Sequence, residues 1–209
     1  MSATLDNPPQ IAGVLLAGGA ARRMGGGDKC LRELAGRPIL ERLIERVTPQ
    51  VSTLFINANG DPARFAHYGL NVIADPIDDQ PGPLAGVLAG MIAAADSGAT
   101  AVMSVPGDAP FVPLDLVARL DAARAEAEDR IVLAGSGGRI HPVCGLWPVS
   151  LRADLAAALT TGTRKVLDWT GPHDTVSVEF PVGEDGVDPF FNANRPEDLD
   201  TAERLIARS

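Results

Sequence analysis

Residues 16–29 have the sequence Leu16-Ala17-Gly18-Gly19-Ala20-Ala21-Arg22-Arg23-Met24-Gly25-Gly26-Gly27-Asp28-Lys29. They come directly after an apolar run, Ile11–Leu16, which is typical of a buried strand. Five glycines allow backbone N–H groups to converge on one point, and two arginines and a lysine add positive charge. A strand, a cationic glycine-rich loop and then a helix commonly bind phosphate, so this stretch predicts a nucleotide site on an α/β fold. The alternative, a tight surface turn, leaves the three cations unexplained.

Two common phosphate-binding motifs are absent from this stretch. The Walker A motif requires Gly-Lys-Ser/Thr, but Gly27 is followed by Asp28, Lys29 and Cys30. The dinucleotide fingerprint requires a third glycine at the position that Cys30 occupies. The sequence therefore supports neither a P-loop NTPase nor a dehydrogenase with this fingerprint.

Length and charge restrict the class of protein. The chain has 209 residues, enough for one domain with a sizeable core. Its net charge of -9 argues against nonspecific nucleic-acid binding, which requires a basic face. A nucleotide substrate remains compatible with this charge, because a cationic loop and a divalent metal reverse the local field.

The chain also indicates where the protein works. Cys30 and Cys144 are far apart in the sequence, which favours neither a disulfide scaffold nor a zinc site and suits a reducing compartment. Residues 1–10 lack the order of a signal peptide, and we expect a flexible segment there, followed by one domain over residues 11–209. The longest apolar stretch, Leu84–Ala95, is too short to cross a bilayer. We expect a cytoplasmic monomer without a membrane partner.

Strand and helix patterns alternate along the chain, which predicts a Rossmann-like α/β sandwich with a mostly parallel central sheet and helices on both faces. The expected strands are Ile11–Leu16, Thr53–Asn57, Asn71–Ala74, Ala101–Val105, Arg130–Ala134, Ile140–Leu146 and Thr175–Phe180. The expected helices are Ile39–Val47, Pro83–Ala95, Pro113–Glu126, Leu151–Leu159, Arg164–Trp169 and Pro196–Ala207.

Polar residues follow the first four expected strands. The first strand ends in the glycine-rich loop, and the other three end at Asn57-Ala58-Asn59, Asp75-Pro76 and Pro106-Gly107-Asp108. If these strands are parallel, all four groups meet at the carboxyl edge of the sheet, where open α/β sheets bind ligands.

Asp108 and Lys29 are the candidate catalytic pair. Asp108 follows an apolar strand and a glycine, and Mg²⁺ favours one or two carboxylates together with substrate phosphates, so we expect Asp108 to be a magnesium ligand. Its alternative role is a helix cap. Lys29 closes the loop, where it can follow the phosphates as charge moves onto pyrophosphate; the alternative is a solvated lysine. Arg22 and Arg23 are adjacent, so we expect their side chains to point in different directions, one toward phosphate and the other toward a carboxylate.

Asn57 and Asp75 are the candidate base- or ribose-binding residues. Asn57 offers a donor and an acceptor, and Asp75 accepts from ribose hydroxyls or guanine N–H groups. Turn chemistry explains the same residue types, with Asn59-Gly60 as a tight turn and Asp75 in an Asx turn. Gly82 precedes Pro83 at an expected helix start, where a free N–H meets a ligand.

Several motifs together resemble the molybdenum cofactor guanylyltransferase (MobA) family of nucleotidyltransferases, in that family's order and over roughly residues 11–206. They are Leu-Ala-Gly-Gly, Arg-Met-Gly and Asp-Lys in the loop, Asn57-Ala58-Asn59, Asp75, Pro81-Gly82-Pro83-Leu84-Ala85-Gly86, Pro106-Gly107-Asp108-Ala109-Pro110, His141-Pro142 and Phe191-Asn192-Ala193-Asn194.

The resemblance implies transfer of GMP from GTP to molybdenum-molybdopterin with Mg²⁺ as cofactor, and it leaves room for other cofactor-biosynthesis or acceptor proteins as partners. It implies catalytic roles for Lys29, Asp108 and Arg23, with the metal on Asp108. The implied GTP-binding residues are Leu16, Ala17, Gly18, Gly19, Arg22, Lys29, Asn57, Asp75, Gly82 and Asp108, and the implied molybdopterin-binding residues are Asn192 and Asn194. Arg164 opens an expected helix, so we expect it to contact the phosphate of molybdopterin; the alternative is a surface charge. We assign His141 no role. Two alternatives stay open: a sibling transferase that uses CTP or makes a nucleotide sugar, and a non-catalytic nucleotide-binding module.

Overall fold

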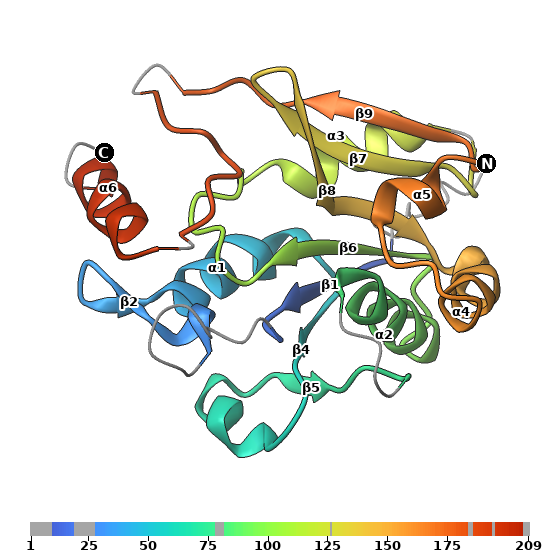
Figure 1. Cartoon of the computed structure of the whole chain (residues 1–209), viewed down its shortest axis with the longest axis horizontal. Coiled ribbons are helices and arrows are strands. Elements are labelled where there is room, and N and C mark those ends of the chain that lie inside the picture. The colour runs from blue at the N-terminus through green and yellow to red at the C-terminus, as the bar shows by residue number, and fades with distance from the viewer. Residues whose placement is uncertain are drawn as a thin grey trace, which may run out of the picture.

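The computed structural model describes residues 10–18, 28–77, 82–125, 127–183, 186–193 and 195–206, so residues 1–9 of the expected N-terminal segment lie outside it. Within the described residues a seven-stranded sheet runs through the protein in the order β5-β4-β1-β6-β8-β7-β9 (Figure 1). Its strands are β1 (Ile11–Leu16), β4 (Thr53–Asn57), β5 (Asn71–Ile73), β6 (Ala101–Pro106), β7 (Ile131–Ser136), β8 (Arg139–Pro148) and β9 (Thr175–Glu179).

The sheet is mostly parallel, as predicted. β5, β4, β1 and β6 pair side by side in parallel, and β7 pairs with β9 in parallel. β8 lies between β6 and β7 and is antiparallel to both. Burial explains the composition of β1 and β6, because a central strand covered on both faces carries an almost continuous apolar run.

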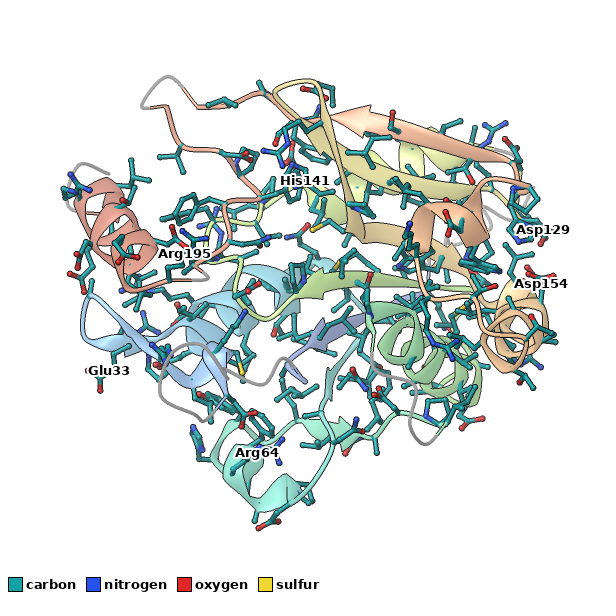
Figure 2. All side chains as sticks on the ribbon, viewed as in Figure 1. Glu33, Arg64, Asp129, His141, Asp154 and Arg195 are labelled. Atoms are coloured by element: carbon teal, nitrogen blue, oxygen red, sulfur yellow. The ribbon has the colours of Figure 1, made fainter. Side chains whose placement is uncertain are left out.

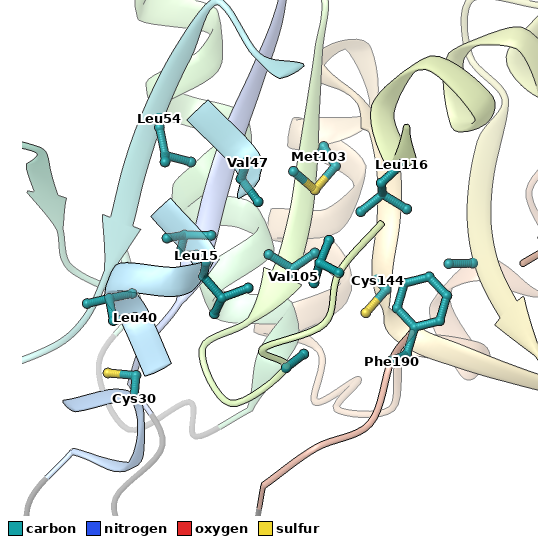
Figure 3. Close-up of a cluster of buried hydrophobic side chains, with 14 of the residues drawn as sticks. Leu15, Cys30, Leu40, Val47, Leu54, Met103, Val105, Leu116, Cys144 and Phe190 are labelled. Atoms are coloured by element: carbon teal, nitrogen blue, oxygen red, sulfur yellow. The ribbon is translucent and has the colours of Figure 1, made fainter. Parts of the chain in front are cut away.

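Helices cover both faces of the sheet, which confirms the predicted sandwich. The buried side chains of α1 (Ile39–Val47), α3 (Leu116–Arg124) and α6 (Pro196–Ile206) belong to one apolar cluster, part of which Figure 3 shows around Leu15 and Val105. Those of α2 (Pro83–Asp96), α4 (Arg152–Thr160) and α5 (Val166–Thr170) belong to a second cluster on the opposite face. None of the helices described is long and apolar enough to span a membrane.

The short elements differ most from the expectation. The hairpin of β2 (Glu33–Leu34) and β3 (Arg37–Pro38) was not predicted, because its turn residues Ala35 and Gly36 adopt positive φ without the usual Asn-Gly signal. α3 begins at Leu116, three residues after the expected start at Pro113. The 3-10 helices η1 (Lys29–Leu31), η2 (Thr48–Gln50), η3 (Pro62–Tyr68) and η4 (Val149–Leu151) were not predicted either.

The register of the parallel strands aligns their carboxyl ends. Leu16 at the end of β1 pairs with Asn57 at the end of β4 and with Pro106 at the end of β6. Asn57 in turn pairs with Ile73 at the end of β5. The residues after these four strands therefore emerge at one edge of the sheet, as the sequence predicted.

Candidate active site

A pocket of about 400 Å³ lies at this carboxyl edge. It unites the ends of all four parallel strands with the start of η1, the start of α2 and one residue of β8. Its lining consists of Leu16, Ala17, Gly18, Lys29, Cys30, Asn57, Asn59, Asp75, Gly82, Pro83, Pro106, Gly107, Asp108 and Val143. Eight of the residues expected at the site therefore line one pocket: Leu16, Ala17, Gly18, Lys29, Asn57, Asp75, Gly82 and Asp108.

Two asparagines hold the carboxylate of Asp75 at one end of the pocket. The Asn57 amide donates to Asp75 Oδ1 at 2.9 Å, and the Asn59 amide donates to Asp75 Oδ2 at 2.7 Å. The backbone N–H of Asp75 donates back to Asn59 Oδ1 at 2.8 Å. Each carboxylate oxygen has a second lone pair, so this fixed carboxylate remains able to accept from a ligand.

Asn57 is a buried part of this arrangement. Its side chain is 5% exposed, and its amide nitrogen also donates to the carbonyl of Ile73 at 3.2 Å. A Cβ on Gly86 of α2 would overlap Asn57 Oδ1, so the absence of a side chain there makes room for the asparagine. Asn57 thus orients Asp75 and lines the pocket. Both hydrogens of its amide N–H₂ group already bond within the protein, to Ile73 and Asp75.

Lys29 and Asp108 lie at the other end of the pocket. Lys29 Nζ is 4.0 Å from Asp108 Oδ2, and their side chains are 28% and 16% exposed. Burial raises the pKa of Asp108 above its ordinary value, and the Lys29 charge opposes that rise. The Asp108 carboxylate is therefore poorly solvated, so a further cation at this position would be stabilising.

Gly107 permits the close approach that forms this end. Its N–H donates to the carbonyl of Leu16 at 2.9 Å, which ties the end of β6 to the end of β1. A Cβ on Gly107 would lie 3.0 Å from Cys30 Cβ and 3.1 Å from Leu16 O. A side chain at this position would push apart the segments that carry Lys29 and Asp108.

The donor set fits the magnesium ion that the resemblance implies. Magnesium prefers oxygen ligands and usually takes one or two carboxylates, with waters and substrate phosphates completing the shell. Asp108 supplies such an oxygen, which is only partly solvated, and it lines the pocket beside Lys29. Across the described residues no three or more His, Cys, Asp or Glu side chains are grouped so that they could hold a metal ion by themselves.

The residues expected for molybdopterin are less closely assembled. Asn192 is exposed, and its neighbour Ala193 donates its N–H to the backbone carbonyl of Asp108 at 2.9 Å. Arg164 is exposed and lies beside Gly82, because its backbone carbonyl is 3.9 Å from the position that a Cβ on Gly82 would take. Its guanidinium donates to the carbonyls of Leu159 and Thr163. The expected site residues outside the described part of the chain are Gly19, Arg22, Arg23 and Asn194.

His141, to which we assigned no role, is labelled in Figure 2 and belongs to a partly buried polar cluster with Ser136 and Asp188. Ser136 Oγ lies 2.7 Å from His141 Nε2 and donates to Asp188 Oδ1, also at 2.7 Å. Because the Ser136 hydroxyl donates its hydrogen to Asp188, Ser136 Oγ accepts the hydrogen bond with His141. His141 Nε2 therefore carries a hydrogen and is the donor. Asp188 also accepts from the N–H of Phe190, so the cluster fastens residues 188–190 to β7 and β8.

Sequence reasoning missed several residues of the pocket. Asn59 was interpreted as part of a turn, although its spacing of two from Asn57 was the available signal for a second pocket residue. Val143 comes from the antiparallel strand β8 and follows no strand end, so no pattern indicated it. Cys30 is buried. Its burial, and to a lesser extent the negative charge of Asp28, raise the pKa of the thiol to about 12. This thiol is therefore not a nucleophile at neutral pH.

Comparison with known proteins agrees with this geometry. Residues 13–176 match the family described as "MobA-like NTP transferase domain". A protein of Rhodopseudomonas palustris (strain BisB5) named molybdenum cofactor guanylyltransferase is 55% identical over 203 residues, covering 96% of each chain. A protein of the same name from Bradyrhizobium sp. (strain ORS 278) is 52% identical over 207 residues, covering 98% of this chain and 97% of the relative.

A solved structure has the same fold. The molybdopterin-guanine dinucleotide biosynthesis protein A of Archaeoglobus fulgidus superposes with a TM-score of 0.75 at 23% identity, covering 95% of this chain and all of the other. At this identity the likeness supports the α/β architecture alone.

Proposed function

This chain belongs to the family of MobA-like NTP transferase domains, and from that premise we propose that it transfers GMP from GTP to the terminal phosphate of molybdenum-molybdopterin. The products are molybdopterin guanine dinucleotide and pyrophosphate. The observation that carries the proposal is the pocket itself, in which one fixed carboxylate follows β5 and one lysine–carboxylate pair lies at the end of β6, three strands away along the sheet edge. A nucleoside triphosphate has a base at one end and phosphates at the other.

Asp75 is suited to guanine. The N1–H and N2–H₂ groups of guanine are neighbouring donors, and the Asp75 carboxylate is an acceptor held by Asn57 and Asn59. Adenine and cytosine each present a ring nitrogen lone pair beside their amino group, which would face the carboxylate unpaired. A site that hydrogen-bonds its substrate rejects analogues that leave buried groups without partners.

Lys29 and Asp108 are suited to the transfer step. An oxygen of the acceptor phosphate attacks the α-phosphorus of GTP while the bond to pyrophosphate breaks, and the acceptor is already ionised, so no strong base is needed. Lys29 stabilises the charge that develops on the departing pyrophosphate. Asp108 would hold Mg²⁺, which when bound neutralises phosphate charge. Positioning of two reactants contributes up to ~7–11 kcal/mol of barrier lowering.

The proposed binding site for the acceptor, molybdenum-molybdopterin, lies beside the nucleotide pocket. The hydrogen bond from the Ala193 N–H to the Asp108 carbonyl supports a place for Asn192 near the transferred phosphate. Arg164, which lies beside Gly82 at the start of α2, is the proposed partner of the molybdopterin phosphate. We further propose that the protein acts in the cytoplasm as a monomer, for which the free thiols Cys30 and Cys144 suit a reducing compartment.

Pyrophosphate release with molybdenum-molybdopterin and each of GTP, CTP and a sugar phosphate tests the function. The proposal requires release that depends on both GTP and the pterin. Turnover with CTP instead would assign a sibling transferase, and GTP binding without pyrophosphate release would assign a non-catalytic module. Omission of Mg²⁺ in the same assay tests the metal requirement.

A further inference from the structure

Arg64 lies outside the pocket lining but touches the segments at both of its ends. It is part of η3, between β4 and β5, and Figure 2 shows it on that connection. Its Nε donates to Asp28 Oδ2 at 2.6 Å, and its terminal NH2 nitrogen donates to the carbonyl of Asn59 at 2.7 Å. Its other terminal nitrogen donates to the carbonyl of Asp61.

These contacts connect the two functional ends of the site through one side chain. Asp28 immediately precedes Lys29, which pairs with Asp108. Asn59 holds the carboxylate of Asp75. A continuous series of contacts therefore runs from Asp75 through Asn59, Arg64 and Asp28 to the lysine at the phosphate end.

The guanidinium is itself held in place. Its Cζ lies 4.6 Å from the ring centroid of Phe65, which is completely buried, and the Arg64 side chain is only 28% exposed. The planar fork of arginine reaches three acceptors with fixed angles, which a lysine ammonium on a flexible stem does not reproduce. Hydrogen bonds to a carboxylate from a charged donor are also the stronger kind.

We propose that Arg64 is a positioning residue that fixes the positions of Asp75 and Lys29 relative to each other. Through Asp75 and Lys29 it helps to determine both the affinity and the base selectivity for the nucleotide. This rests on the proposed function for the identity of the nucleotide. It needs no contact between Arg64 and the substrate, since Arg64 acts through Asn59 and Asp28.

The test compares Arg64→Ala and Arg64→Lys with a matched control. Arg130 also donates from Nε to an aspartate, Asp174, at 2.9 Å and is also 28% exposed, but it lies before β7, away from the pocket. Binding of GTP and ATP with Mg²⁺ is measured by titration calorimetry, and the melting temperature of each ligand-free protein is measured on the same preparation.

We expect Arg64→Ala to weaken GTP binding by about tenfold or more, the equivalent of one charge-assisted contact, and to lower the ratio of GTP to ATP affinity. Arg64→Lys should lie between wild type and Arg64→Ala. Arg130→Ala should change neither affinity nor ratio, whatever its melting temperature. A purely structural role predicts that all three variants lose only thermal stability.

Wild-type GTP affinity and selectivity in folded Arg64→Ala would overturn the inference. If that variant does not fold, the same result in Arg64→Lys overturns it. Failure of the proposed function has a different signature, because wild-type protein would then show no preference for GTP over ATP. In that case Arg64 is judged on affinity alone: Arg64→Ala should still weaken the binding of GTP and ATP, and unchanged affinity for both would overturn the inference.

Discussion

The ammonium of Lys29 lies 4.0 Å from the carboxylate of Asp108, although one begins η1 and the other follows β6. Burial raises the pKa of Asp108 more than Lys29 lowers it, so the pair leaves part of the carboxylate charge uncompensated. Such an arrangement costs folding stability and suits a site that receives a metal ion and phosphates.

Asp108→Asn separates these two roles. The substitution keeps the shape of the side chain and removes a poorly solvated charge, so the melting temperature should stay the same or rise. Turnover should fall by at least ~10³-fold, because phosphate charge is no longer neutralised by a bound cation. Both quantities are measured on one preparation, and excess Mg²⁺ should restore part of the rate. A lower melting temperature with near-normal turnover would instead assign Asp108 to helix capping.

Lys29→Ala should reduce turnover far more than stability. Its side chain is partly exposed, and ion pairs of partly exposed lysines contribute little to folding stability, so the fold should lose little. The developing charge on pyrophosphate loses a direct partner, and we expect a fall in kcat of ~10²-fold or more. Steady-state kinetics and thermal melting together check this. Wild-type kcat in a folded Lys29→Ala protein would remove Lys29 from the mechanism.

A pair of glycines on α2 distinguishes a pocket role from a packing role. A Cβ on Gly86 would overlap the Asn57 amide that orients Asp75, whereas a Cβ on Gly90 would lie 2.7 Å from Val14 Cγ1 in the sheet. Both alanine variants should lower the melting temperature through overpacking. Only Gly86→Ala should also lower the ratio of GTP to ATP affinity, measured by titration calorimetry. Equal ratios in the two variants would mean that Asn57 does not set the position of Asp75.

The sequence predicted the parts of the fold that depend on local pattern. β1, β4 and α1 have the expected bounds, because their apolar spacing is strong and their ends carry turn or cap residues. The meeting of four strand ends followed from the parallel order, and the register of Leu16 with Asn57 and Pro106 confirms it.

Long-range side-chain contacts were not predictable in the same way. Nothing local indicated that Arg64 would pair with Asp28, or that Asn57 and Asn59 would both bind Asp75, since each contact joins segments that only the sheet register brings together. The same holds for Ser136 and Asp188, which come from β7 and from the segment before α6. His141-Pro142 was visible as a motif, but its partners were not.

His141 should make stability depend on pH. Burial lowers its pKa, and the Arg139 charge adds to this, while Asp188 and Glu179 act in the opposite direction. The folded protein therefore binds the proton less readily than the unfolded chain, whose histidines titrate at about pH 6.5. The contribution of neutral His141 is complete above that pH and is lost as the pH falls through the folded-state pKa.

His141→Gln tests this, because glutamine retains an N–H that can donate to Ser136 and has no titration in this range. Denaturant unfolding of wild type and variant is measured at intervals from about pH 8 to pH 5.5, above the ordinary range of most carboxylates. The unfolding free energy of wild type should fall more steeply toward the acidic end, so that the two curves converge or cross. Parallel curves across the whole range would show that His141 binds protons equally in the folded and unfolded states. They would also remove the argument that the folded protein holds the His141 ring in its neutral form, with its one hydrogen on Nε2.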